Sequence, residues 1–224
     1  MLKSFRWLAL EAKYLDEART FYEDSLGLAV IRERETEVVY AAGDNQLVLR
    51  RPTDVPRGGI HTHYAFSTPA DRYEAWWDRL SDSFDLQEHS FGSVDSLYLY
   101  DPDGNCVEIG GIDDTGEEIT GIFEVVLEVE DLARAESFYE HLGFTAVDRG
   151  SSRRRVRLSG PMDLELWEPQ LGIADARGGL HVDMGFEAEP DEVLIAIGEH
   201  ACAVVDLDEG VRIKDPDGHW LTFY

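Results

Sequence analysis

The sequence predicts an α+β fold made of two similar halves, and in each half a strand, a helix and three strands follow one another twice. Three observations support this prediction. The stretch GIFEVVLEVEDLARAESFYEHLG at 121–143 has a counterpart, FRWLALEAKYLDEARTFYEDSLG, at 5–27. Each half also contains an RGG segment followed by a strand-like run, and each contains the turn DPDG. Landmarks that recur in the same order indicate a duplicated unit.

The stretch 121–143 has the pattern of a strand followed by a helix. Alternation of apolar and other residues predicts a strand with one apolar face, formed by Phe123, Val125, Leu127 and Val129. Asp131 stands at the N-cap position of the helix, and Gly143 can end it in the left-handed conformation. In the earlier copy Tyr14 replaces Asp131, which predicts a weaker helix start.

The remaining elements follow in the same order in both halves, as apolar alternation and turn residues indicate. In the first half we expect strands near 28–33, 37–42, 46–50, 60–68, 94–100 and 105–110, with a helix around 73–80. In the second half we expect strands near 146–147, 152–158, 164–167 and 180–188 and after 218, with a helix near 190–200. We therefore predict domains at 1–112 and 121–224, joined by an acidic linker at 113–120.

The net negative charge of the chain excludes some classes of binding partner. The chain of 224 residues has 46 acidic and 20 basic residues and a formal net charge of −26 at pH 7. Such a charge repels nucleic acids and anionic membranes, so neither is an expected partner. Only three of the basic residues are lysines. We interpret this composition as adaptation to a salt-rich, halophilic cytoplasm, because concentrated salt screens the self-repulsion of the chain.

Cysteine content and the length of apolar runs bear on the compartment of the protein. The two cysteines, Cys106 and Cys202, are too few for a disulfide framework and predict buried apolar residues. The N-terminus lacks the apolar region of a signal peptide, and no apolar run approaches the roughly 20 residues that cross a bilayer. We expect a soluble cytoplasmic protein, monomeric or homodimeric, that acts on a small molecule.

Taken together, the FYE..LG, RGG(I/L)H and DPDG motifs resemble the vicinal oxygen chelate superfamily. This superfamily includes glyoxalase I, fosfomycin-resistance transferases, bleomycin-resistance proteins and extradiol dioxygenases. The resemblance covers nearly the whole chain. It implies paired βαβββ modules, two per domain, whose curved mixed sheets form cup-shaped half-barrels around a divalent metal. In glyoxalase I-like members the first module of one domain faces the second module of the other.

The resemblance also implies where metal ligands belong. In the first half the matching positions are Trp7, Val48, His63 and Glu108, and in the second half they are Glu124, Glu165, Asp183 and Thr222. Exchanged modules bring His63, Glu108, Glu124 and Glu165 into one cup. The other cup then holds Trp7, Val48, Asp183 and Thr222, which do not form a ligand set. We therefore predict one metal site built from both domains and a second cup filled by Trp7.

Three carboxylates and one imidazole suit Mn²⁺, Fe²⁺, Co²⁺, Ni²⁺ or Zn²⁺. Buried carboxylates also need a cation to offset their charge. The resemblance implies a metal-dependent isomerase or lyase of the glyoxalase I type, acting on a small oxygenated substrate. Glu108 or Glu124 would be its catalytic base.

Substrate contacts are predicted around the basic run SSRRRVR. If Val156 faces the helix, then Arg153, Arg155 and Arg157 lie on the cup side and bind an anionic substrate, unless they pair with surface carboxylates. His61 shares a strand face with His63 and is also expected near the substrate. Because His181 matches His61 in the other half, His61 is expected to pack or to form hydrogen bonds rather than to bind metal.

Two alternatives stay open at this point. The first is an extradiol dioxygenase. The resemblance implies that such an enzyme holds Fe²⁺ with two histidines and one carboxylate, a set that this chain offers only if His61 also binds metal. A metal-free binding protein similar to the bleomycin-resistance proteins would use an aromatic cup containing Trp7 and would bind its ligand without turnover.

Overall fold

The computed structural model describes residues 1–52, 58–60, 62–113, 115–116, 118–169, 173–177 and 182–224. Within them the predicted order of strand, helix and three strands occurs four times. The first module contains β1 (Leu2–Glu11), α1 (Leu15–Arg19), the π-helix η1 (Thr20–Ser25), β2 (Val30–Arg34), β3 (Glu37–Ala42) and β4 (Asn45–Arg50). The second contains β6 (His63–Pro69), η2 (Ala70–Arg72), α2 (Tyr73–Leu80), β7 (Gln87–Phe91), β8 (Val94–Tyr100) and β9 (Cys106–Asp113).

The second half repeats this series. The third module contains β10 (Gly121–Glu128), α3 (Leu132–His141), β11 (Thr145–Arg149), β12 (Arg155–Ser159) and β13 (Asp163–Trp167). The fourth contains β15 (Val182–Ala188), α4 (Pro190–Ile197), η3 (Gly198–His200), β16 (Ala203–Leu207), β17 (Gly210–Lys214) and β18 (Trp220–Phe223). Two short strands between modules, β5 (Gly58–Ile60) and β14 (Ile173–Arg177), pair with each other.

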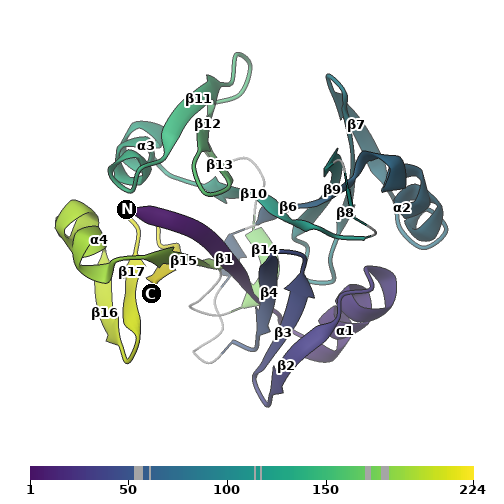
Figure 1. The fold of residues 1–224 in the computed structure, drawn as a ribbon, viewed down its shortest axis with the longest axis horizontal. Helices are drawn as coiled ribbons and strands as arrows, with labels where there is room; N and C mark the ends of the chain where they lie inside the picture. Colours follow the sequence, from purple (N-terminus) through teal and green to yellow (C-terminus); the bar gives the residue numbers. More distant parts are fainter. Residues whose placement is uncertain (53–57, 61, 114, 117, 170–172, 178–181) are drawn as a thin grey trace.

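The modules combine into two curved eight-stranded mixed sheets (Figure 1). One sheet has the order β16-β17-β18-β15-β1-β4-β3-β2, and the other has the order β11-β12-β13-β10-β6-β9-β8-β7. The first module thus shares a sheet with the fourth, through antiparallel β1 and β15. The second shares a sheet with the third, through antiparallel β10 and β6. This confirms the predicted exchange of modules, whereas the domain boundaries at 112 and 121 stay a prediction.

Local sequence signals act as expected at the helix ends. The Asp131 side chain accepts a hydrogen bond of 3.0 Å from the backbone N–H of Arg134 and so caps α3. Tyr14 provides no such bond, and α1 lasts only five residues before the π-helix begins. Gly27 and Gly143 have φ angles of 71° and 101° after their helices, a conformation that glycine adopts without strain.

A large apolar core lines one face of each sheet and includes buried residues of all four modules. We call the opposite face of each sheet its cup face. Figure 1 shows α3 beside α4 at one flank of the two sheets and α1 near α2 at the other. Among the described residues no helix has the length and apolar character needed to span a membrane.

The structure corrects some details of the sequence interpretation. A register shift lies between Ile122 and Glu124, so Ile122 is buried in the core while Phe123 is only half-buried. Phe123 was expected on the core face, and the bulge moves it to the other face because one extra residue reverses the alternation. Cys202 is exposed and Cys106 is half-buried, contrary to the expectation that both are buried.

Candidate metal centre

Three neighbouring strands place acidic and imidazole side chains together on one cup face. Parallel pairing sets Ala65 of β6 opposite Glu108 of β9, and antiparallel pairing sets the same Ala65 opposite Glu124 of β10. Ala65 therefore lies between the two glutamates, and its short side chain leaves room above the sheet. His63, two residues earlier on β6, points to the same face because side chains alternate along a strand.

His63, Glu108 and Glu124 form a tight cluster. One potential ligand atom from each lies within 4.8 Å of the other two, and all three side chains are buried. Nε2 of His63 donates to Oε2 of Glu108 at 3.0 Å. We call this group the HEE cluster. It unites three of the four metal ligands that the sequence predicts for this cup.

The two glutamates of the HEE cluster differ in their electrostatic surroundings. Burial opposes ionisation of Glu108, but hydrogen bonding and charge from His63, followed by Tyr98, hold its pKa below the ordinary value. Burial raises the pKa of Glu124 to about 8. Arg157 counteracts this rise, while the charges of Glu165, Glu108 and Asp163 add to it. The negative charge of Glu124 is therefore incompletely compensated.

The hydrogen bonding of Glu124 points to the same conclusion. Its Oε2 atom is buried without a hydrogen-bond partner among the described residues. Nη2 of Arg157 lies 2.7 Å from this oxygen, but the contact lacks the alignment of a hydrogen bond. A buried carboxylate oxygen without a hydrogen bond is costly, and a coordinated cation relieves that cost.

Glu165, the fourth predicted ligand, lies outside the HEE cluster. It pairs with Val126 rather than with Glu124, and it stands one strand further from His63. Its carboxylate accepts hydrogen bonds of 3.1 Å from Nη1 of Arg155 and 2.7 Å from Nε1 of Trp167. Both of its oxygens are thus engaged by other side chains on the same cup face.

Of the three predicted arginines, Arg157 lies beside the HEE cluster, and all three contact other side chains. Arg157 binds Asp163 through Nε and Nη2, at 3.2 and 2.8 Å. Arg155 also binds Asp148 at 2.7 Å. The guanidinium carbon of Arg153 lies 5.3 Å from the ring centre of Trp167. The side chain of Arg157 is 33% exposed, so this cation lines the open side of the cup. His61 lies outside the described residues.

The second cup is built differently, around a buried aspartate. Asp183 is fully buried, accepts a hydrogen bond of 2.9 Å from Thr222, and lies 3.2 Å from both Nη1 of Arg50 and Nε of Arg212. Trp7 packs with Val48 and two other small apolar side chains. The arginines were not predicted. The position of Arg212 in the sequence could have indicated its role, because it stands three residues before the aspartate of the second DPDG turn.

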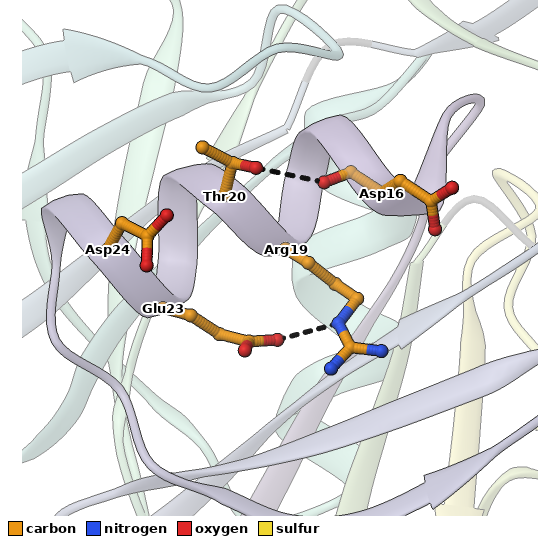
Figure 2. A pocket seen from close by; sticks show the side chains of 5 residues that line it. All are labelled: Asp16, Arg19, Thr20, Glu23 and Asp24. Atoms are coloured by element: carbon orange, nitrogen blue, oxygen red, sulfur yellow. Dashed lines mark hydrogen bonds and ion pairs between the residues drawn. The ribbon is translucent and has the colours of Figure 1, made fainter.

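A hollow of about 260 Å³ lies on α1 and η1. It is lined by Asp16, Arg19, Thr20, Glu23 and Asp24 (Figure 2). Arg19, the cation of this group, binds Glu23 at 2.7 Å and is also paired with Glu33. Thr20 donates to the backbone carbonyl of Asp16. The five residues lie on α1 and η1 and belong to neither cup.

Known proteins resemble the chain in sequence over about half of its length. A model of the family described as the Glyoxalase/Bleomycin resistance protein/Dioxygenase superfamily matches residues 4–109. The metallothiol transferase FosB of Staphylococcus haemolyticus is 25% identical over 123 residues, which cover 51% of this chain and 88% of that protein. The glutathione transferase FosA of Serratia marcescens is 28% identical over 114 residues, which cover 49% and 81%.

Solved structures resemble the whole chain. Glyoxalase I from Zea mays superposes with a TM-score of 0.73 at 19% identity, over 98% of this chain and 91% of that chain. A Bacillus subtilis protein assigned as a candidate dioxygenase superposes with a TM-score of 0.76 at 15% identity, over 99% and 84%. At such identities the likeness establishes the shared fold and not a shared activity.

Proposed function

Because this chain belongs, through residues 4–109, to the glyoxalase/bleomycin resistance protein/dioxygenase superfamily, we propose that it is a metal-dependent enzyme of the glyoxalase I type. The substrate would be a small oxygenated molecule, and the reaction an isomerisation or lyase step. The observation that carries this proposal is the HEE cluster, in which one imidazole and two carboxylates converge within 4.8 Å.

The residues present fit a divalent ion. In the part of the chain that the structure describes, Glu124 has a buried oxygen without a hydrogen bond, and the cation paired with it is Arg157. One imidazole and two carboxylates suit Mn²⁺, Fe²⁺, Co²⁺, Ni²⁺ or Zn²⁺. His63, Glu108 and Glu124 would hold the ion. Glu165 would join them only by giving up its bonds to Arg155 and Trp167.

The chemistry follows from these groups. A divalent ion bound there supplies Lewis acidity, which stabilises negative charge on a substrate oxygen. The carboxylates of Glu108 and Glu124 are the groups that can accept a proton from the substrate carbon and return it to a neighbouring atom. Arg157 and Arg155 hold the acidic side chains in place, and Arg157 presents a partly exposed guanidinium to an anionic oxygen of the substrate.

The first test is the metal content of protein purified in high salt without chelator or affinity-tag metal. We expect about one transition metal ion per chain. Glu124→Ala should lose this ion. Asp183→Ala should keep it, because Asp183 is in the other sheet and is held by arginines. A wild-type protein that takes up no metal even on reconstitution would leave a metal-free binding protein as the better account.

The reaction is tested with small α-oxygenated carbonyl compounds, each offered with and without a thiol. Metal-dependent isomerisation, followed by proton NMR, supports the proposal. Oxygen uptake with catechols, together with bound iron, would instead indicate a ring-cleaving dioxygenase that uses a second histidine.

A second candidate function is metal-dependent thiol transfer. It is favoured by the two sequence relatives, whose names describe a metallothiol transferase and a glutathione transferase. The two functions differ in what happens to the thiol. A transferase joins the thiol to an electrophilic co-substrate through a thioether, whereas the isomerase converts the hemithioacetal of the thiol and a carbonyl compound into a thioester. Both consume free thiol, but hydroxylamine cleaves only the thioester, so a colorimetric thiol assay before and after hydroxylamine treatment separates them.

A further inference from the structure

Tyr98 lies beside His63 and Glu108, two members of the HEE cluster. It is on β8, where antiparallel pairing sets it directly opposite Glu108 of β9. Its neighbours Leu97 and Leu99 are buried in the core, so the phenol ring is on the cup face. Its ring centre lies 5.6 Å from that of His63 in an edge-on contact and 5.3 Å from that of His89.

These contacts constrain both His63 and Glu108 from the same side. Edge-on packing restricts the rotation of the imidazole, which carries the nitrogen that faces Glu108. The hydroxyl of a tyrosine is a hydrogen-bond donor at neutral pH, and cross-strand pairing places that of Tyr98 beside the Glu108 carboxylate.

The other sheet uses the same position in the same way. Arg212 stands three residues before Asp215, as Tyr98 stands three residues before Asp101. Arg212 is directly opposite Thr222, the counterpart of Glu108. Its Nε atom lies 3.2 Å from Thr222 Oγ1 and 3.2 Å from Asp183 Oδ2. In both sheets the residue at this position thus contacts the side chains at the last two ligand positions.

We propose that Tyr98 is a positioning residue of the metal centre, which holds Glu108 with its hydroxyl and His63 with its ring so that both converge with Glu124. This inference rests on the proposed function, since it requires that the HEE cluster binds a metal. Groups that hydrogen-bond a ligating carboxylate fix its orientation, and their removal typically weakens metal binding about 10- to 100-fold.

The test compares Mn²⁺ binding by isothermal titration calorimetry in metal-free wild type, Tyr98→Phe and Tyr73→Phe. Tyr98→Phe keeps the ring and removes only the hydroxyl. Tyr73→Phe is the matched control, because the hydroxyl of Tyr73 donates to Glu88 at 2.7 Å and both residues lie outside the cluster. We expect affinity to fall about 10- to 100-fold in Tyr98→Phe and to stay unchanged in Tyr73→Phe.

A spectroscopic readout separates positioning from general destabilisation. The visible absorption bands of the Co²⁺-loaded protein report ligand geometry, so we expect them to shift in Tyr98→Phe while the melting temperature of the metal-free protein stays close to that of wild type. Wild-type affinity and an unshifted Co²⁺ spectrum in Tyr98→Phe would overturn this proposal and leave the metal-dependent function intact. Wild-type protein that binds neither Mn²⁺ nor Co²⁺ would overturn both.

Discussion

Tyr139 donates a hydrogen bond of 2.9 Å to Asp215, and both side chains are fully buried. Tyr139 belongs to the FYE motif on α3, and Asp215 begins the DPDG turn between β17 and β18 of the other sheet. The first half contains the same pair, since Tyr22 donates to Asp101 at 2.7 Å. The two motifs that reveal the sequence repeat are thus partners in space, and each pair links one sheet to the other.

Removing this link should destabilise the fold. In Tyr139→Phe the buried Asp215 keeps its bonds from the backbone N–H groups of Asp217 and His219 but loses the phenol donor. A hydrogen bond to a charged group contributes about 1.5–3 kcal/mol, so we expect a loss of that size in the free energy of unfolding by urea. Tyr14→Phe, at an exposed tyrosine, is the control and should change little. Equal stability of the two variants would contradict the assigned role of the pair.

The motifs explain why much of the fold was predictable. Paired landmarks at fixed intervals define the four modules, and the complementary ligand positions of the two halves indicate their exchange. The β-bulge before Glu124 could not be predicted from the sequence. The alternation of apolar residues along a strand reveals an inserted residue only when the pairing with the neighbouring strand is known. Nor did it show that Glu165 is held by Arg155 and Trp167, since those contacts depend on which residues stand opposite each other on neighbouring strands.

The position of Glu165 predicts unequal effects on metal binding. Glu124→Gln removes a predicted metal ligand of the HEE cluster and should weaken Mn²⁺ binding by more than ~100-fold. A loss of ~100-fold is the largest that is typical when a residue that only hydrogen-bonds a ligand is removed. Glu165→Gln retains an oxygen for Arg155 or Trp167 and should weaken binding by less than about tenfold. Calorimetric titration of both metal-free variants measures the difference. Comparable losses would show instead that Glu165 is a ligand, as the sequence predicted.

Glu37 should contribute to acid sensitivity. Burial opposes its ionisation, but hydrogen bonds and charge from Arg50 and then Arg32 lower its pKa below the ordinary 4.5. The unfolded chain therefore takes up a proton at this site first as the pH falls. The stabilisation is complete above about pH 4.5 and is lost as the pH falls toward the lower pKa of the folded state. Urea unfolding of wild type and Glu37→Gln should differ by about 1 kcal/mol near neutrality and converge in acid. A gap that is constant with pH would rule this out.

The net charge of −26 predicts a strong salt dependence of stability. Raising KCl from about 0.1 M to about 1 M shortens the screening length from ~10 Å to ~3 Å and weakens repulsion among the carboxylates. We expect the melting temperature of the metal-free protein to rise over this range, as measured by calorimetry. The rise should shrink near pH 4.4, where the net charge approaches zero. A melting temperature independent of KCl at neutral pH would argue against adaptation to a salt-rich cytoplasm.

The second cup should depend on a close contact between Trp7 and Gly185, which stand opposite each other on β1 and β15. A Cβ atom added at Gly185 would come within 2.1 Å of the Trp7 indole, whereas the corresponding pair in the other sheet is Glu124 and Ala65. Gly185→Ala should therefore lower the free energy of unfolding by about 1–3 kcal/mol through overpacking.

A double-mutant cycle isolates the contact between these two residues. In a Trp7→Leu background the smaller side chain leaves room for the methyl group, so Gly185→Ala should cost less there than in wild type. Mn²⁺ affinity should be unchanged in all three variants, because the HEE cluster is in the other sheet. Additive costs would show that Trp7 does not fill this cup over Gly185, and a loss of Mn²⁺ binding would show that the two cups are not independent.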